Sequence, residues 1–526
     1  MKPSRLLIKK YFESNSVIES IIKSYNDFID FGMQQVVNEI GEIEPTIIPA
    51  NLEEYKIKFG KIRIGSPQIV EADGSVRDLY PFEARIRELT YAAPIYLEFI
   101  PVINQLVQKP QEVKIGMMPI MLKSKYCRLY NLKPEELIEL GEDPDDFGGY
   151  FIINGSEKVI INIEDLSPNN FIVNKDPITE AYVGRVFSEN GAYRIPLTLE
   201  LRNDLIFSVS FTRLKKVPLV VLLKALGINN DEEIMKSISP NEEGLNLVLI
   251  NLYEFAEIKD SIEAIDYIAR NIGMTHPFEI RVQRMEQILD QFLLPHVGVT
   301  KDERRLKAYT LAKYANKLIK VAQGIIPEDD RDHYMNKRIK TAGDSLTDLF
   351  RYNFRILVKD IMYNFQRIVK RGKLPPLNTI VRDKLFTSRF FSAMATGNWV
   401  GERTGVCQRY MRWSYLESLS HTQRVSSLLD SNQENFDARA LHPTHFGRLC
   451  AIETPEGKNV GLRKNLAIMS YISRYYDETE IYDVLEKLGL KISDPVVKEA
   501  TKKMHGIVKI TDLSENAKKA SMDLKN

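Results

Sequence analysis

Apolar residues recur at both helical and strand spacing along this chain, which predicts a mixed α+β protein. Helical spacing runs through residues 17–37, and an extended segment is expected at 55–64. Apolar residues three or four positions apart over 346–368 predict a long amphipathic helix with one apolar face. A similar spacing over 311–321 predicts another helix, which Gly324 ends.

Turn residues between apolar runs predict two hairpins. Asn154 and Gly155 separate two apolar runs within 148–161, which is a strong short-range hairpin signal. Apolar residues alternate over 195–201 and again over 207–211, with a polar turn between the two runs.

A third turn, at residues 72–74, precedes a mixed charged and apolar run that ends at Ile95. If that run is a strand, Arg85 and Arg87 lie on one face, because strand side chains alternate with a period of two.

At 526 residues the chain is too long for one hydrophobic core, so several domains are expected. Its formal net charge is only +1, and any contact with nucleic acid must therefore come from a local basic face. Residues 337–384 hold twelve Lys or Arg and four Asp or Glu residues. This segment could be a solvated face or a wall that faces phosphates. The phosphate-facing candidates are Lys337, Arg338, Arg351 and Arg355.

The three cysteines, Cys127, Cys407 and Cys450, are far apart and odd in number. This argues against a disulfide framework and a cysteine zinc site, and favours a reducing interior. The N-terminus does not resemble a signal peptide, and no apolar run approaches the ~20 residues that span a bilayer. A cytoplasmic location is therefore expected.

Two segments contain candidate chemistry. In the glycine-rich segment 395–405, Trp399 and Arg403 could contact nucleic acid by stacking and phosphate pairing. The segment 438–466 contains histidines and acids between glycines and prolines, which predicts a series of turns and short strands. One alternative is a metallohydrolase that uses the residues His442, His445 and Glu453, although Pro443 forbids a helical HExxH geometry. A second alternative is a free-standing nucleic-acid-binding or scaffold protein.

The segment 438–466 reads LHPTHFG, then C, then ETPEG, then GLRKN. In this order and spacing it resembles the second-largest (beta or B) subunit of cellular RNA polymerases. The resemblance extends in separate blocks over roughly residues 15–475. It points to the N-terminal half, of the B″ type, of a split archaeal DNA-directed RNA polymerase subunit. On this interpretation the chain stops near an external domain because the gene is split.

The segment 407–425 continues the resemblance, and its residues Gln408, His421 and Arg424 match the family pattern. Gln423 replaces the first arginine of the usual pair, and Met411 and Arg412 occupy a region that more often contains Asp. In bacterial members this region lines the rifamycin pocket. The departures suggest an archaeal-like member.

The resemblance implies an α+β multidomain protein whose protrusion, lobe and fork form one side of a polymerase cleft. The expected parts are residues 1–165 (first part of the protrusion), 166–330 (lobe), 331–390 (second part of the protrusion), 391–470 (fork) and 471–526 (start of the external domain and C-terminal tail).

The resemblance also implies roles for individual residues. Those expected to face the hybrid or the downstream fork are Arg403, Gln408, His421 and Arg424. Those expected near the substrate end of the active centre are Arg439, Glu456 and Lys464. For each of these residues an interdomain salt bridge or hydrogen bond remains an alternative, for example between Arg439 and Glu453.

The implied function is template-directed RNA synthesis by a DNA-directed RNA polymerase, a nucleotidyltransferase, with no activity of this chain alone. The family's motif for catalytic Mg²⁺ belongs to the largest subunit, so no metal, cofactor or catalytic residue is expected here. Expected partners are the second-half polypeptide of the B subunit, the largest and smaller polymerase subunits, the DNA template and the nascent RNA, but no membrane.

Overall fold

The computed structural model describes residues 3–14, 17–49, 52–176, 179–191, 193–202, 204–240, 244–372, 374–401, 403–473 and 478–489. The chain divides into a large unit, Met1–Ser470, and a small unit, Tyr471–Asn526. In the small unit the structure describes helix α17 (Glu478–Lys487). The expected C-terminal tail beyond it lies outside the described residues, and the rest of the fold belongs to the large unit.

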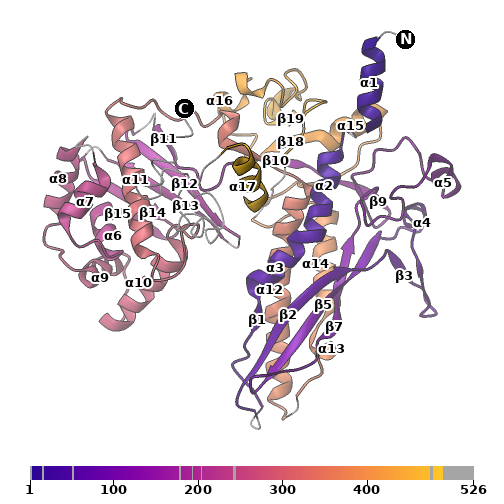
Figure 1. The fold of residues 1–526 in the computed structure, drawn as a ribbon, viewed down its shortest axis with the longest axis horizontal. Coiled ribbons are helices and arrows are strands. Elements are labelled where there is room, and N and C mark those ends of the chain that lie inside the picture. Colours follow the sequence, from indigo (N-terminus) through magenta and orange to yellow (C-terminus); the bar gives the residue numbers. More distant parts are fainter. Residues whose placement is uncertain are drawn as a thin grey trace. The chain divides into compact units, whose positions relative to one another are not determined.

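After an N-terminal helix, α1 (Pro3–Ser14), and the helices described next, the large unit forms an antiparallel sheet of five strands, in which β5 pairs with β2 on one side and with β7 on the other (Figure 1). Its strands are β1 (Glu42–Ile43), β2 (Tyr55–Ile64), β5 (Ala92–Ile103), β6 (Leu106–Val107) and β7 (Gln111–Pro119). Strand β2 coincides with the extended segment expected at 55–64, which confirms that prediction.

Helices from both ends of the large unit pack in one core with this sheet. They are α2 (Glu19–Asp27), the π-helical turn η1 (Phe28–Gly32), α3 (Met33–Ile40), α12 (Ala342–Val369), α13 (Leu377–Ile380) and α14 (Asp383–Thr396). The helix predicted at 17–37 is therefore confirmed, with a π turn in its middle. The predicted helix at 346–368 is also confirmed as part of α12.

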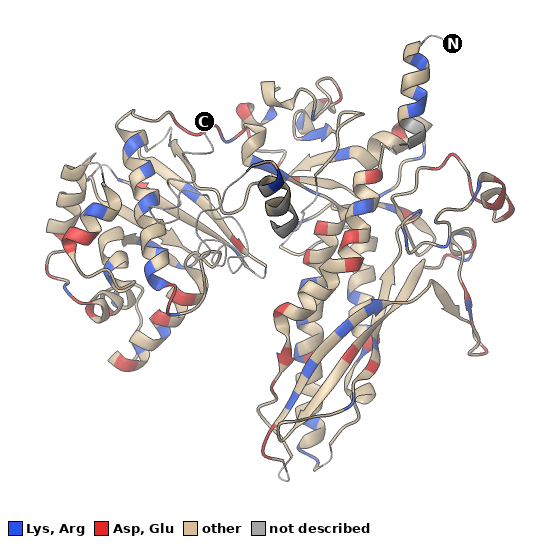
Figure 2. Cartoon of the chain, viewed as in Figure 1, with Lys and Arg blue, Asp and Glu red and all other residues tan. Residues whose placement is uncertain are grey.

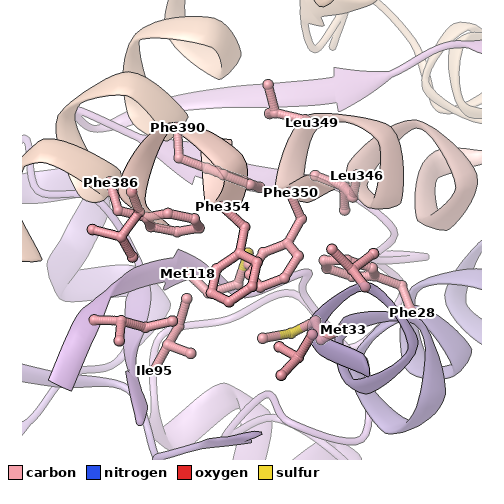
Figure 3. Packing of buried hydrophobic residues seen from close by; sticks show 14 of the residues in the cluster. Phe28, Met33, Ile95, Met118, Leu346, Leu349, Phe350, Phe354, Phe386 and Phe390 are labelled. Atoms are coloured by element: carbon pink, nitrogen blue, oxygen red, sulfur yellow. The ribbon is translucent and has the colours of Figure 1, made fainter. Parts of the chain in front are cut away.

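The apolar face of α12 forms the centre of this core (Figure 3). Phe350 and Phe354 are fully buried, and Phe350 contacts Phe28 edge-on at a ring-centroid distance of 6.2 Å. The core includes residues from Ile18 to Leu419 but none from the second core described below. Segments that lie more than 300 positions apart therefore share one interior.

A close approach of α2 and α12 depends on glycine. The Gly343 amide donates to the Ser24 hydroxyl at 2.8 Å, and a Cβ atom at position 343 would collide with the Ser24 carbonyl oxygen. Only a residue without a side chain fits between the two helices at this point.

A second core contains only residues between Phe171 and Val321. Its antiparallel sheet runs in sequence order through β11 (Ile172–Lys175), β12 (Tyr182–Asn190), β13 (Tyr193–Leu201), β14 (Phe207–Phe211) and β15 (Leu214–Pro218). The helices that follow are α6 (Leu219–Ala225), α7 (Asp231–Ile238), α8 (Leu245–Glu254), α9 (Ser261–Asn271), α10 (Phe278–Phe292) and α11 (Arg304–Ala322). The pairing of β13 with β14 and the end of α11 before Gly324 confirm the predicted hairpin and helix.

The predicted hairpin at 148–161 is also present, as β8 (Phe151–Ile153) and β9 (Ser156–Ile160). Asn154 and Gly155 have φ angles of 49° and 71°, as a tight hairpin turn requires. Strand β17 (Cys407–Arg409) pairs with the other edge of β9. This pairing attaches the segment that contains Gln408 to the hairpin.

The prediction of a strand that carries Arg85 and Arg87 is wrong, because the structure forms no strand there. The turn at 72–74 does join two strands, β3 (Gln68–Val70) and β4 (Val76–Asp78). The run then forms helix α4 (Pro81–Ile86), which Pro81 starts because its fixed φ suits a first helical turn. Arg85 forms ion pairs with buried acids, whereas Arg87 pairs with acids near the surface.

A four-stranded sheet joins four segments that are distant in sequence. Its order is β16 (Lys337–Lys340), β10 (Asn162–Leu166), β18 (Arg424–Ser427) and β19 (Arg463–Asn465). Strands β10 and β18 are parallel, and the outer pairs are antiparallel. Of the helices that the structure describes, none is both long and apolar enough to cross a bilayer.

Candidate nucleic-acid interface

The register of the four-stranded sheet sorts its charged residues onto two faces. Directly paired residues share a face, and neighbours along a strand lie on opposite faces. One face carries Glu164, Lys337 and Lys464, and we call it the buried face. The other carries Asp165, Arg338, Lys340, Arg424 and Arg463, and we call it the basic face.

Glu164 is the centre of the buried face. Its carboxylate accepts from the Lys337 ammonium at 2.9 Å, from the Lys464 ammonium at 3.0 Å and from the Tyr334 hydroxyl at 2.7 Å. Asp332 provides a second carboxylate for Lys337, at 3.0 Å. These contacts connect three strands and the 3₁₀ turn η2 (Tyr334–Asn336).

The ammonium groups determine the charge state of Glu164. Burial alone would raise its pKa, but Lys464 and Lys337 outweigh burial and hold the pKa at about 2. Burial lowers the pKa of Lys464, which shares its one carboxylate with Lys337. The cluster is therefore an ionic group in which each charge depends on the others.

This geometry changes the interpretation of two candidates. Lys337 was expected to face phosphates and Lys464 to lie near the active centre. They are 9% and 6% exposed, and both ammonium groups are bound to Glu164. Their charges are neutralised inside the protein, so neither is presented to a ligand. The sequence shows a basic residue, but only the strand register shows that it points inward.

The histidines of the 438–466 segment also have structural partners. Across the 3₁₀ turn η3 (Pro443–His445), His442 contacts the Thr444 hydroxyl at 2.7 Å and Asp330 at 2.8 Å. His445 is buried, and its ring meets Tyr334 edge-on at 5.2 Å between centroids. Burial lowers the pKa of His445 to about 4, so the ring is neutral at physiological pH.

The metallohydrolase alternative requires a cluster that the described residues do not form. Glu453 accepts a hydrogen bond from Ser420 and does not join the histidines. Over the described ranges, no group of three or more His, Cys, Asp or Glu side chains is arranged to hold a metal ion. These residues therefore provide no metal-activated nucleophile.

The basic face has Asp165 among its arginines. Arg194 donates to the Asp165 carboxylate at 2.8 Å, and Arg403 lies 3.6 Å from it. Arg194 comes from strand β13, and Arg403 comes from the glycine-rich segment, so one carboxylate connects both to the sheet. The Arg403 side chain keeps 25% of its surface exposed.

Three further cations of the basic face have fewer anionic partners. Arg424 pairs with Glu417 at 3.3 Å. Arg338 is exposed, and among the residues that the structure describes it bonds only to backbone carbonyls, those of Met335 and Lys337. Arg463 forms no ion pair with any residue that the structure describes. The structure thus places Arg338 and Arg424, which the sequence had marked separately, on one face of the sheet, with Arg403 beside Asp165 of that face.

Gln408 and His421 bond to each other next to the basic face. The His421 ring accepts from the Met411 amide at 3.2 Å and contacts the Gln408 side-chain oxygen at 3.4 Å. The Gln408 amide group donates to the Gly405 carbonyl at 2.9 Å. His421 is fully buried, and burial with the charges of Arg424 and Arg463 lowers its pKa to about 4. The two residues hold the segment that follows the glycine-rich loop.

The glycine-rich segment does not present its tryptophan to a ligand. Trp399 is 8% exposed, packs into the first core, and donates its indole N–H to the Ser345 carbonyl at 2.8 Å. The interpretation of Trp399 as a stacking platform is therefore wrong. A tryptophan between glycines is compatible with either role, because its pattern says nothing about which partner covers the ring.

Arg412 has a separate network of partners, although its side chain is 40% exposed. Its guanidinium lies 4.9 Å and 4.6 Å from the ring centroids of Tyr150 and Tyr410, and it pairs with Glu157 and Asp146. Cation–π contact and paired carboxylates explain how an arginine is accommodated at this position.

Arg439 is held by backbone and not by Glu453. It donates to four carbonyl groups, those of Lys458, Val460, Ser431 and Gln433. The suggested salt bridge with Glu453 is therefore wrong. Arg439 fixes the ETPEG turn from one side, and Glu456 is exposed on that turn.

The long helix α12 uses its arginines differently from the expected wall. Arg351 pairs with Glu39 at 2.9 Å and with Asp348 at 3.2 Å, and its side chain is only 13% exposed. Arg355 is half-buried. Both basic and acidic residues lie along α12 (Figure 2). Lys337 and Arg351 therefore neutralise carboxylates of this chain.

Sequence reasoning missed Glu164 and Asp165, the two acids that organise the sheet. Both lie in a segment of otherwise apolar character, NIEDL, directly after a predicted hairpin. An acid inside an apolar strand needs a cationic partner, so this pattern was an available signal. The identity of the partners was not available from local spacing.

Two family models match the chain. The model described as RNA polymerase beta subunit matches residues 16–388, and the model described as RNA polymerase Rpb2, domain 3, matches residues 408–472. Together they cover the second core, the four-stranded sheet and most of the first core.

Several archaeal proteins are similar over nearly the whole chain. DNA-directed RNA polymerase subunit Rpo2N of Methanocaldococcus jannaschii is 42% identical over 499 residues, covering 93% of this chain and 99% of that protein. Subunit Rpo2N of Methanococcus vannielii is 41% identical over 497 residues, covering 93% and 99%. Subunit Rpo2 of Saccharolobus shibatae is 42% identical over 498 residues, covering 94% of this chain but only 44% of that protein.

Proposed function

The chain belongs to the RNA polymerase beta-subunit family, and from this premise we propose that it is the N-terminal half of a split second-largest subunit of an archaeal DNA-directed RNA polymerase. It spans less than half of the Rpo2 relative but nearly all of the Rpo2N relatives. Its role would be to form one side of the cleft that holds DNA and RNA during template-directed synthesis.

The observation that carries this proposal is the basic face. Arg338 and Arg424 come from distant segments yet lie on the same face of one sheet, and Arg403 contacts Asp165 of that face. Gathered arginines attract phosphates without reading sequence, which suits a protein that must hold any template. Arg439, Glu456 and Lys464 would belong to the surroundings of the active centre, with Lys464 acting through Glu164 and not on substrate.

The proposed parts follow the two cores. Residues 1–165 and 331–390 would form the protrusion, and their shared core around α12, which also takes in residues of the following segment, supports joining these two parts. Residues 166–330 would form the lobe, which has its own core. Residues 391–470 would form the fork, and the enzyme would work in the cytoplasm.

Catalytic Mg²⁺ would be held by the largest subunit, as the resemblance to the polymerase family implies. We therefore assign no step of the reaction to a metal ion on this chain. What this chain would contribute is binding and positioning: guanidinium groups that hold backbone phosphates, and a buried ionic cluster that fixes the strands that carry them.

Reconstitution tests this function. The chain would be combined with the second-half polypeptide, the largest subunit and the smaller subunits, and RNA synthesis would be measured on a DNA template. Synthesis that requires this chain is the expected result, together with no nucleotidyl transfer by the chain alone. An assembly that forms and synthesises RNA equally well without the chain would overturn the proposal.

A further inference from the structure

Arg463 differs from the arginines around it in the partners of its guanidinium. Arg424 pairs with Glu417, Arg403 lies beside Asp165, and exposed Arg338 donates to two backbone carbonyls. Arg463 is half-buried, yet it forms no ion pair with any of the described residues. A half-buried guanidinium without a counter-charge has lost part of its hydration, and no ion pair offsets this desolvation cost.

The position of Arg463 places it beside Arg424. Ser426 pairs directly with Arg463, and Arg424 is two residues from Ser426, so both arginines lie on the basic face as diagonal neighbours. Both charges also act on the His421 ring. The two neighbouring guanidinium groups have one carboxylate between them, that of Glu417, which pairs with Arg424, so one positive charge remains for a second anion to neutralise.

The backbone that carries Arg463 is fixed on both sides. Lys464 is bound to Glu164 on the buried face, so the strand cannot rotate without breaking that ion pair. The Thr454 hydroxyl donates to the Arg463 carbonyl at 2.9 Å and accepts from the Gly461 amide at 2.9 Å. A guanidinium on such a strand is positioned before a ligand arrives, which lowers the cost of binding.

We propose that Arg463, together with Arg424, binds a backbone phosphate of the nucleic acid in the assembled polymerase. This inference rests on the proposed function. A planar guanidinium matches the oxygens of a phosphate in a two-pronged contact. The same chemistry would suit the triphosphate of an incoming nucleotide, so the test separates the two sources of phosphate.

The test uses the assembled polymerase with the wild-type chain, Arg463→Gln, Arg463→Lys and, as a matched control, Arg448→Gln. Arg448 is an exposed arginine of the same segment whose side chain bonds to the Thr444 carbonyl. Two quantities are measured: the lifetime of halted transcription complexes as a function of salt concentration, and the KM for nucleotides.

Arg463→Gln is expected to shorten the lifetime several-fold and to lower the logarithmic salt dependence by about one phosphate contact, with an unchanged KM. Arg463→Lys should recover most of the salt dependence, and Arg448→Gln should match the wild type. A purely structural role would shorten lifetimes in both Arg463 variants without changing the salt dependence.

Three results would overturn the inference. They are an unchanged salt dependence in Arg463→Gln, an increased KM with normal lifetimes, which would assign the nucleotide triphosphate, and an equal loss in the Arg448 control. If the proposed function itself is wrong, the wild-type assembly would make no RNA, and this result distinguishes that failure from failure of the inference about Arg463.

Discussion

The Glu164 carboxylate lies 3.0 Å from the Lys464 ammonium, although the two residues are 300 positions apart in the chain. This contact gives the four-stranded sheet its two faces. It fixes β19 on β10 through β18, so that Arg463 and Arg424 occupy the face opposite to the ion cluster. Positioning of the proposed phosphate-binding arginines thus depends on an ionic contact that no nucleic acid touches.

Glu164→Gln should destabilise the large unit by about 3–5 kcal/mol, because it leaves the buried Lys464 ammonium without a carboxylate and Lys337 with Asp332 alone. Urea unfolding measures this loss. Asp332→Asn is the matched control, since Lys337 then keeps Glu164, and its cost should be only about 1–2 kcal/mol. An equal loss of unfolding free energy in the two variants would contradict the claim that Glu164 is the main carboxylate of the ion cluster.

Stability should fall between pH 7.5 and 5.5 because of buried neutral histidines. The folded pKa of His421 is about 4, below its ordinary value of 6.5, so the unfolded chain takes up a proton first. The contribution of His421 to the free energy of unfolding is therefore fully present above pH 6.5 and is lost as the pH falls toward 4. At pH 5.5 the loss is about 1.4 kcal/mol for one such histidine.

His421→Gln measures the share of this residue. The variant should reduce the pH dependence of the unfolding free energy by about 1 kcal/mol over that range. His445 would still contribute, because burial also lowers its pKa to about 4. A variant with the full wild-type pH dependence would show that His421 is not held neutral by the fold.

Trp399→Phe should cost about 1 kcal/mol of stability, since it removes the hydrogen bond to the Ser345 carbonyl but retains an aromatic ring in the core. Thermal unfolding checks this cost. The salt dependence of nucleic-acid binding by the assembled enzyme should not change. Weaker binding at unchanged stability would restore the stacking role for Trp399.

Arg424→Glu should shorten the lifetime of transcription complexes and leave subunit assembly intact, because a carboxylate would repel a phosphate on the basic face. Complex lifetime and co-purification of the partner subunits are measured on the same preparation. If assembly fails instead, the ion pair of Arg424 with Glu417 serves the structure and not the nucleic acid.

Local patterns predicted the elements of this fold well. The apolar spacing of α12, the alternation in β13 and β14, and the Asn154 turn each depend on neighbours a few residues away. The helix α4 was missed because Arg85, near its end, and Arg87, directly after it, also fit the period of a strand.

Candidate residues were harder to predict than elements, because their partners come from distant segments. Lys337, Arg351 and Lys464 all appeared as free basic residues, and each is bound to a carboxylate. Only the parallel pairing of β10 with β18 decides that Lys464 points inward while Arg463 points to the other face. That pairing has no signal within either strand.

The central claim is that the basic face binds nucleic acid. Crosslinking from one position on each face of β18 tests this claim most directly. Ser426 lies on the basic face and Ser427 on the buried face, so a diazirine-bearing amino acid at either position probes one face only. The assembled polymerase would be halted on labelled DNA with labelled RNA and irradiated. A nucleic-acid crosslink from position 426 but not from 427 is the predicted result. No crosslink from 426, or equal crosslinks from both positions, would contradict the assignment of the basic face to nucleic acid.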